Sequence, residues 1–197
     1  MMKSVKIIIA NTQLAAGKEE YILSQIAPCY AEKHKGTKIQ KDAEQELVTG
    51  YLLNRYLGIE KDEQLTYNAY NKPSLVSSDL FFNISHSDDY VVLAIADCDV
   101  GVDVERIRSC HEATVKKVFS TKQKNELLKL EGQAKNEKFT EIWTQCEAML
   151  KLKGTGFGED WDKEKDPAEC SLYTTRIDDY ILTCATEKQA PIVIDQL

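Results

Sequence analysis

The sequence has few of the residues from which disulfide or zinc scaffolds are built. Its 197 residues include three histidines and six cysteines. The cysteines form no CxxC pair, and their spacing to the histidines is not that of a metal site. Free, reduced thiols are typical of cytoplasmic proteins. The cysteine usage therefore predicts a cytoplasmic protein.

Long hydrophobic runs are missing as well. No stretch approaches the roughly 20 apolar residues that span a membrane. Near the start of the chain, only residues 7–10 are continuously apolar before polar residues interrupt them. This run is too short for the apolar region of a signal peptide, so it predicts a first strand. We expect no membrane partner.

Positive charge is in deficit, because the formal net charge is -7. An acidic chain of this kind argues against general nucleic-acid binding. It also requires that any anionic substrate be held by local cations or by a metal ion. The most basic short segment carries Lys33, Lys35, Lys38 and Lys41; an ordinary solvated loop would look the same.

The apolar patterning predicts a mixture of helices and strands. Residues 66–79 are polar and predict a surface loop, whereas "DCD" at 97–99 suggests the turn of a hairpin between two neighbouring strands. Helices are predicted at 18–27, 42–57, 112–119, 122–130 and about 136–153, and strands at 7–10, 90–96, 100–105, 170–176 and 180–186.

One internal similarity organises this layout. The segment "DDYVVLAIA" from Asp88 is matched by "DDYILTCAT" from Asp178. The match predicts two related halves, 1–98 and 99–197, each a small sheet-plus-helix unit. We therefore expect an α+β pseudo-dimer whose ligand site lies between the halves.

Two carboxylates follow a buried strand in the segment "GVDVE". Asp103 and Glu105 are two positions apart, so their side chains point to one face of a strand, opposite the valines. Taken alone, this segment favours the solvated outer face of an edge strand. Two adjacent carboxylates raise each other's pKa unless a cation lies between them.

A third carboxylate lies on the long predicted helix, in "FTEIWTQCEAMLKLKG". Cys146 falls on the apolar stripe, whereas Glu147 and Lys151 lie on another side. These two form either an exposed ion pair or part of a site. In the second interpretation, Asp103, Glu105 and Glu147 supply oxygen ligands for Mg²⁺, which commonly takes carboxylates, water and substrate phosphate.

These segments together resemble the 4'-phosphopantetheinyl transferases of the surfactin-synthetase-activating type. The resemblance rests on the order and spacing of short motifs and covers most of the chain, faintly before residue 42 and after residue 157. The motifs are "NKP" from Asn71, "FNISHS" from Phe82, "GVDVE" from Gly101, "VFS" from Val118 and "WTQCEAMLKLKGTG" from Trp143.

The resemblance implies an enzyme that transfers 4'-phosphopantetheine from coenzyme A to a serine of an apo acyl or peptidyl carrier protein. It implies Mg²⁺ dependence, release of 3',5'-ADP and a monomer with its site between two α/β halves. The residues that match the family's site are Asp103, Glu105 and Glu147 for the metal, Glu147 and Lys151 for catalysis, and Lys33, Lys72, Pro73, Ser85 and His86 for coenzyme A.

Each of these residues also has an ordinary structural interpretation when taken singly, and three positions depart from the family's pattern. Cys146 stands where members usually carry Lys or Arg, and Gln45 and Glu46 stand where Arg and Thr are common. The alternative function is therefore a relative that binds coenzyme A or a carrier protein without transferring the group.

Overall fold

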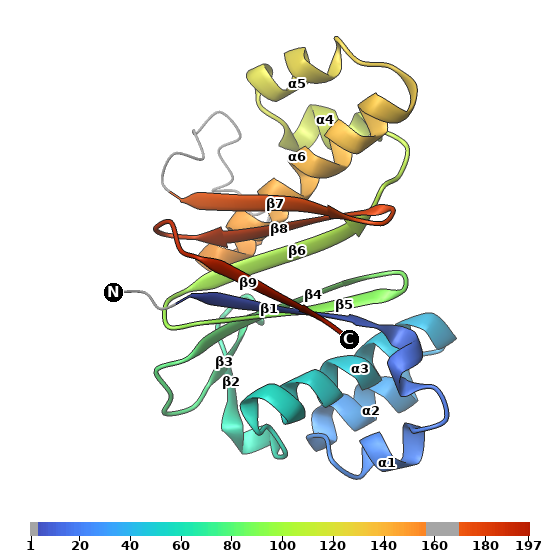
Figure 1. The fold of residues 1–197 in the computed structure, drawn as a ribbon, viewed down its shortest axis with the longest axis vertical. Helices are drawn as coiled ribbons and strands as arrows, with labels where there is room; N and C mark the ends of the chain where they lie inside the picture. The colour runs from blue at the N-terminus through green and yellow to red at the C-terminus, as the bar shows by residue number, and fades with distance from the viewer. Residues whose placement is uncertain (1–3, 157–169) are drawn as a thin grey trace.

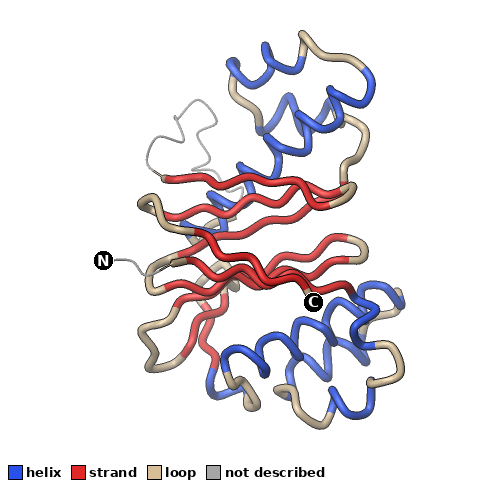
Figure 2. The backbone as a smooth tube through the Cα atoms, in the orientation of Figure 1, coloured by secondary structure: helices blue, strands red, loops and turns tan. Residues whose placement is uncertain are grey.

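The structure is a computed structural model that describes residues 4–156 and 170–197. Its layers stack along the long axis of the molecule (Figure 1): a helical layer, a sheet, a second sheet and a second helical layer. Figure 2 shows that the strands gather in the middle, with helices on both outer sides. The predicted α+β class is confirmed. Among the helices described, none is long and apolar enough to cross a membrane.

The first sheet has the strand order β4-β5-β1-β9. Its central strands carry the longest apolar runs of the chain and are buried on both faces. Its last strand pairs in parallel with β1 and comes from the C-terminus, so it crosses the predicted boundary at residue 98. The strands are β1 Val5–Asn11, β4 Phe81–Ser87, β5 Tyr90–Ala96 and β9 Ile192–Gln196.

Three helices cover the outer face of this sheet (Figure 1). The longest ends at Gly58, whose φ of 66° is the left-handed conformation that closes helices. A short two-stranded sheet follows, within the stretch predicted as a loop. The elements are η1 Thr12–Ala15, α1 Glu19–Leu23, α2 Pro28–Gly36, α3 Gln40–Leu57, η2 Asp62–Gln64, β2 Leu65–Tyr67 and β3 Pro73–Leu75.

The second sheet has the order β6-β8-β7 and is covered on its outer face by one long helix. That helix ends at Gly154, with φ of 67°, as predicted. The elements are β6 Val100–Arg106, α4 Glu112–Val118, α5 Thr121–Leu127, α6 Gly132–Lys153, β7 Ser171–Ile177 and β8 Tyr180–Thr186.

The two sheets face each other across an apolar core. Alternate residues of β1 and β5 meet alternate residues of β6 and β8 there. Val102 and Val104 point into this core, so Asp103 and Glu105 point to the opposite face, toward α6. The predicted placement of the two carboxylates opposite the valines is confirmed.

The predicted repeat appears in the topology of the sheets. The order β4-β5-β1 corresponds to β7-β8-β6, with a long helix before each hairpin. Asp88 and Asp178 both begin a two-residue turn with positive φ, 47° and 49°. The backbone carbonyl of Asp89 accepts from Thr12, and that of Asp179 from Ile107, at equivalent strand ends. That the halves superpose as a pseudo-dimer stays a prediction.

Two tyrosines from the matched segments meet where the halves join. The rings of Tyr90 and Tyr180 pack edge to face, with centroids 4.9 Å apart. Each hydroxyl donates to a carboxylate in the other half's turn: Tyr90 to Asp178 at 2.8 Å, and Tyr180 to Asp89 at 3.3 Å. The repeated segment therefore also supplies the contacts between the halves.

The predicted hairpin between residues 90–96 and 100–105 is wrong. Both edges of β5 are already paired, with β4 and with β1, while β6 pairs with β8. Residues 97–99 therefore carry the chain from one sheet to the other. The predicted helix at 18–27 is also too long, because α1 ends at Leu23. A second helix, α2, begins at Pro28. Its one buried residue is Tyr30, so its sequence has no repeating apolar pattern from which a helix could be predicted.

Candidate functional site

Asp103 lies at the centre of the candidate site, in the middle of β6. Its side chain is 4% exposed, and its Oδ1 atom accepts hydrogen bonds from Lys151 Nζ at 2.7 Å and Ser85 Oγ at 2.8 Å. Its Oδ2 atom is buried and has no hydrogen-bond partner among the described residues. Desolvation raises the pKa of Asp103, and Lys151 opposes that shift. The carboxylate thus has one oxygen still able to accept a ligand.

Ser85 connects the two halves at this point. Its hydroxyl contacts Asp103, lies 3.0 Å from Lys151 Nζ and accepts from the Val104 backbone N–H at 3.2 Å. A hydroxyl has one proton to donate and two lone pairs. All three are used by the protein, so Ser85 holds Asp103 and Lys151 in place.

Glu105 lies two residues further along β6 than Asp103, on the same face of the strand. Its Oε2 accepts from Ser87 Oγ at 2.9 Å and its Oε1 from Trp143 Nε1 at 3.4 Å. Desolvation, and then the charge of Asp103, raise the pKa of Glu105. Both oxygens are therefore oriented, one by β4 and one by α6.

Glu147 lies on α6, four residues before Lys151. Desolvation raises its pKa to about 7, and the charges of Asp103 and Glu105 contribute in the same direction, whereas Lys151 lowers it. The charges of Asp103 and Glu105 therefore influence the protonation of Glu147. A carboxylate with a pKa near neutrality is suited to accepting a proton.

The three carboxylates fit a hard divalent cation in their chemistry. Oxygen ligands suit Mg²⁺, and Asp103 Oδ2 is a buried acceptor without a partner among the described residues. In the parts of the chain that the structure describes, no three His, Cys, Asp or Glu side chains are already grouped closely enough to hold a metal ion. In this arrangement the cationic partner of Asp103 is Lys151.

His86 and Ser85 lie on opposite faces of β4, because neighbouring residues of a strand alternate. Ser85 is buried against β6, whereas His86 is exposed. Although His86 is exposed by its overall surface, its surroundings still desolvate the imidazole and lower its pKa. Lys151 acts in the same direction, whereas the charges of Glu46 and Asp42 on α3 act against it. The predicted contact of His86 with coenzyme A stays a prediction.

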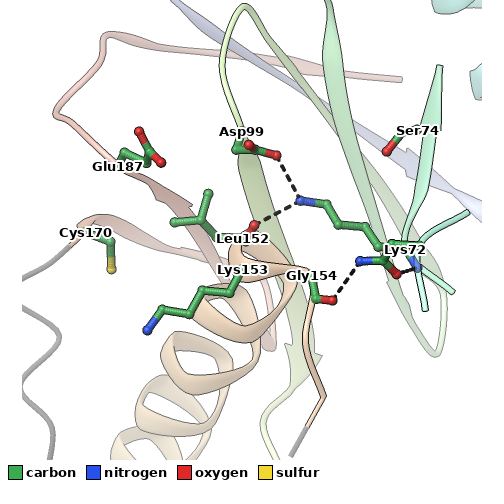
Figure 3. A pocket seen from close by; sticks show the side chains of 9 residues that line it. Lys72, Ser74, Asp99, Leu152, Lys153, Gly154, Cys170 and Glu187 are labelled. Atoms are coloured by element: carbon green, nitrogen blue, oxygen red, sulfur yellow. Dashed lines mark hydrogen bonds and ion pairs between the residues drawn. The ribbon is translucent and has the colours of Figure 1, made fainter. Parts of the chain in front are cut away.

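Lys72 lies at the C-terminal end of α6 (Figure 3). Its Nζ atom is 3.1 Å from the Leu152 carbonyl and 3.5 Å from Asp99 Oδ1, and the neighbouring Asn68 donates to the Gly154 carbonyl at 2.8 Å. These are the unpaired carbonyls of a helix C-terminus, which cations stabilise. Desolvation lowers the pKa of Lys72. The ammonium therefore fastens the loop that precedes Pro73 to α6, beside a cavity of about 410 Å³.

Lys33 lies on α2, in the outer helical layer. Its Nζ atom stands over the Tyr30 ring, 4.7 Å from the centroid. Of the other departures, Gln45 is buried and donates to the Asp88 carbonyl at 2.9 Å, so it supports the β4–β5 turn. The structure thus joins Asp103, Lys151 and Ser85 by hydrogen bonds, with Glu105 two residues along β6 and Glu147 on α6. It places Lys72 and Lys33 elsewhere.

Sequence reasoning missed three side chains in this region. Asn83 and Ser87 contact β6 on either side of Ser85, and Trp143 contacts Glu105. The signal was present in "FNISHS", where three small polar residues alternate along a strand. The pattern alone does not show burial, because polar residues at a strand end are usually solvated.

Cys146 is buried, as predicted from its place on the apolar stripe, with 1% of its surface exposed. Desolvation raises its pKa to about 12, and Glu147 adds to the shift. Because the thiolate is the reactive form, we expect Cys146 to react with iodoacetamide far more slowly than the half-exposed Cys98. Peptide mass spectrometry after timed alkylation of the native protein measures both rates. Alkylation of Cys146 at the rate of Cys98 would contradict the prediction.

The protein so described is an α+β protein with a buried carboxylate, lysine and serine cluster where two halves meet. Residues 99–194 match the model of the 4'-phosphopantetheinyl transferase superfamily. The matched region holds Asp103, Glu105, Glu147 and Lys151. Together with the relatives described next, this match supports membership of that superfamily and confirms the resemblance found in its motifs.

Relatives from bacilli support the same membership. The 4'-phosphopantetheinyl transferase gsp of Aneurinibacillus migulanus is 37% identical over 124 residues, which cover 59% of this chain and 51% of that protein. The 4'-phosphopantetheinyl transferase psf-1 of Bacillus pumilus is 37% identical over 75 residues, or 38% of this chain and 32% of that protein. The 4'-phosphopantetheinyl transferase Sfp of Bacillus subtilis is 26% identical over 155 residues, which cover 76% of this chain and 69% of that protein. The chain thus spans about half of the first relative and a third of the second.

Proposed function

We propose that the protein transfers 4'-phosphopantetheine from coenzyme A to a serine of an apo acyl or peptidyl carrier protein, releasing 3',5'-ADP. The observation that carries this proposal is the Asp103–Lys151–Ser85 cluster, with Glu105 and Glu147 on the neighbouring positions of β6 and α6. Its Asp103 Oδ2 atom is buried and has no hydrogen-bond partner among the residues described. The chain's superfamily supplies the reaction class.

The proposed reaction replaces one oxygen bonded to a phosphorus atom by another. The carrier serine oxygen forms a bond to the phosphorus that bears the pantetheine, and the bond from that phosphorus to the bridging oxygen breaks. The electron pair leaves with 3',5'-ADP. The serine proton passes to Glu147, the carboxylate that α6 contributes to the site.

The other residues of the proposed site orient the substrate and neutralise the charge of its phosphates. Lys151, held by Ser85 and Asp103, supplies positive charge for the phosphate oxygens. Asp103, Glu105 and Glu147 would hold Mg²⁺, which when bound neutralises charge on the pyrophosphate. Ser85, His86, Lys33, Lys72 and Pro73 are proposed to contact coenzyme A. The present partners of the Ser85 hydroxyl and of the Lys72 ammonium give these two residues less support.

We further propose that the protein acts as a monomer in the cytoplasm. The contacts between its halves, among them the paired tyrosines, place the cluster within one chain. The alternative function is a relative that binds coenzyme A or a carrier protein without transfer. Cys146 favours that alternative, since it leaves an apolar, buried side chain where the family usually carries a cation.

The experiment that separates the two functions is mass spectrometry of carrier proteins. Apo acyl and peptidyl carrier proteins are incubated with the protein, coenzyme A and Mg²⁺, and parallel samples contain EDTA. We expect a mass gain of one phosphopantetheine group with Mg²⁺ and none with EDTA. Binding of coenzyme A by calorimetry without any mass gain would instead support the binding relative.

A further inference from the structure

We propose that Ser87, with Ser85 beside it, is a positioning residue that orients the metal-binding carboxylates from the opposite half. The inference rests on the proposed function, because it takes Asp103 and Glu105 as ligands of a divalent cation. It adds a residue of β4 that touches neither the substrate nor the metal and acts through Glu105.

Three side chains of β4 form a ladder that joins it to β6. Asn83, Ser85 and Ser87 alternate along the strand, share its inner face and are each 5% exposed. Each accepts a hydrogen bond from a backbone N–H of β6: Val102 to Asn83 at 2.8 Å, Val104 to Ser85 at 3.2 Å and Arg106 to Ser87 at 3.2 Å. Edge strands usually leave such groups unpaired. Here side chains pair them.

The ladder fixes the direction of each serine proton. A backbone N–H can only donate, so the Ser87 oxygen accepts from Arg106, and its single proton is left for Glu105 Oε2 at 2.9 Å. By the same reasoning, Ser85 accepts from Val104 and Lys151 and donates to Asp103 Oδ1. Both serines therefore donate to a carboxylate oxygen of β6, at 2.8 Å for Asp103 and 2.9 Å for Glu105.

Each serine thereby holds one carboxylate oxygen in place. Glu105 has Ser87 on one oxygen and Trp143 on the other, so its rotation is restricted on both sides. Asp103 has Ser85 and Lys151 on Oδ1, and Oδ2 is left without a partner among the residues described. Partners of this kind around metal ligands typically contribute 10- to 100-fold in metal affinity or activity.

A purely structural ladder would have different consequences. If Asn83, Ser85 and Ser87 only joined β4 to β6, loss of one hydroxyl would lower the melting temperature, as the loss of other buried hydrogen bonds does. Cation affinity would then stay as it was. The two roles are therefore separated by measuring cation binding beside stability.

The test uses Mn²⁺ as the probe, counted by the electron paramagnetic resonance signal of the free ion, without coenzyme A or carrier protein. For Ser87→Ala we expect about 10- to 100-fold weaker Mn²⁺ binding than for the wild type. For Ser87→Thr we expect most of the affinity to return, because the hydroxyl is restored and a strand accepts threonine well.

Thr186→Val is the matched control. Thr186 is 4% exposed on β8, and its hydroxyl donates to the Lys188 carbonyl at 2.8 Å, away from the carboxylates. We expect it to lower the melting temperature while leaving Mn²⁺ affinity unchanged. In transfer assays, Ser87→Ala should raise the Mg²⁺ concentration needed for half-maximal rate, and Thr186→Val should not.

Unchanged Mn²⁺ affinity in folded Ser87→Ala would overturn the proposal, and so would a wild-type protein that binds no Mn²⁺. If Ser87→Ala does not fold, Ser85→Ala gives the same comparison at Asp103, with the same overturning result. A wild type that binds Mn²⁺ but transfers nothing to any carrier would remove the transferase function alone; the role of Ser87 would still be decided by the Mn²⁺ affinities.

Discussion

Asp103→Asn is expected to lower the rate of phosphopantetheine transfer by about 100-fold or more, the usual loss when a preorganised electrostatic group is removed from a phosphoryl or acyl transfer site. Asn has the same shape but no charge. Lys151 then loses its ionic partner, and the proposed cation loses a ligand whose Oδ2 atom has no competing partner among the described residues.

The same substitution is expected to leave the protein folded. Burying a carboxylate costs solvation energy, and desolvation already raises the pKa of Asp103, so its charge is not a source of net stability. We expect a melting temperature close to that of the wild type when no metal is added. Transfer is followed by mass gain of the apo carrier, and unfolding by circular dichroism.

Asp195→Asn provides the matched control for this experiment. Asp195 lies on β9 in an exposed ion pair with Lys6 at 2.9 Å, so the substitution removes a charge of the same kind far from the site. We expect normal transfer and normal stability. Transfer by Asp103→Asn at near the wild-type rate in Mg²⁺ would contradict the assignment of Asp103.

Gly101→Ala is expected to be the most destabilising single-methyl change in the described chain. A Cβ atom at this position would lie 2.1 Å from the Ala148 carbonyl oxygen and 2.4 Å from the Leu152 nitrogen. Both are backbone atoms of α6, so no side chain can turn away to make room. The helix would have to move off β6, and overpacking of this kind costs about 3 kcal/mol or more.

Urea unfolding of Gly101→Ala and the wild type measures this loss. The control is Gly36→Ala at the end of α2, where an added Cβ meets nothing within 4 Å. There we expect no loss, or a slight gain, because alanine favours a helix over glycine. Because α6 carries Glu147 and Lys151, any Gly101→Ala protein that folds should also transfer poorly. A free energy of unfolding equal to that of the wild type would disprove the close approach.

Local patterns in the sequence were sufficient for much of the framework. The helical period of α3 and α6, with Gly58 and Gly154 after them, predicted where both helices end, because helix periodicity and left-handed closure are local properties. The valines of β6 likewise predicted which way Asp103 and Glu105 point. The repeated "DDY" segment predicted two related halves, and Asp88 and Asp178, which begin the matched segments, both have a positive φ.

Pairing between distant segments could not be obtained in this way. Residues 97–99 suit a hairpin turn and a link between two sheets equally well, and only the pairing of β5 with both β1 and β4 excludes the hairpin. The parallel pairing of β9 with β1 joins the two ends of the chain. Nothing in either segment alone specifies such a partner.

The sequence by itself determined the kinds of residue in the site and the faces on which they lie, because these follow from strand alternation and helix period. Only the tertiary structure decided which groups meet. It brought Ser85 and Ser87 of one half onto Asp103 and Glu105 of the other, and it placed Lys72 on the carbonyls at the end of α6. Asp103 is buried because α6 and β4 pack against it. A buried carboxylate beside a lysine has a shifted pKa, and this property depends on segments that are distant in the sequence.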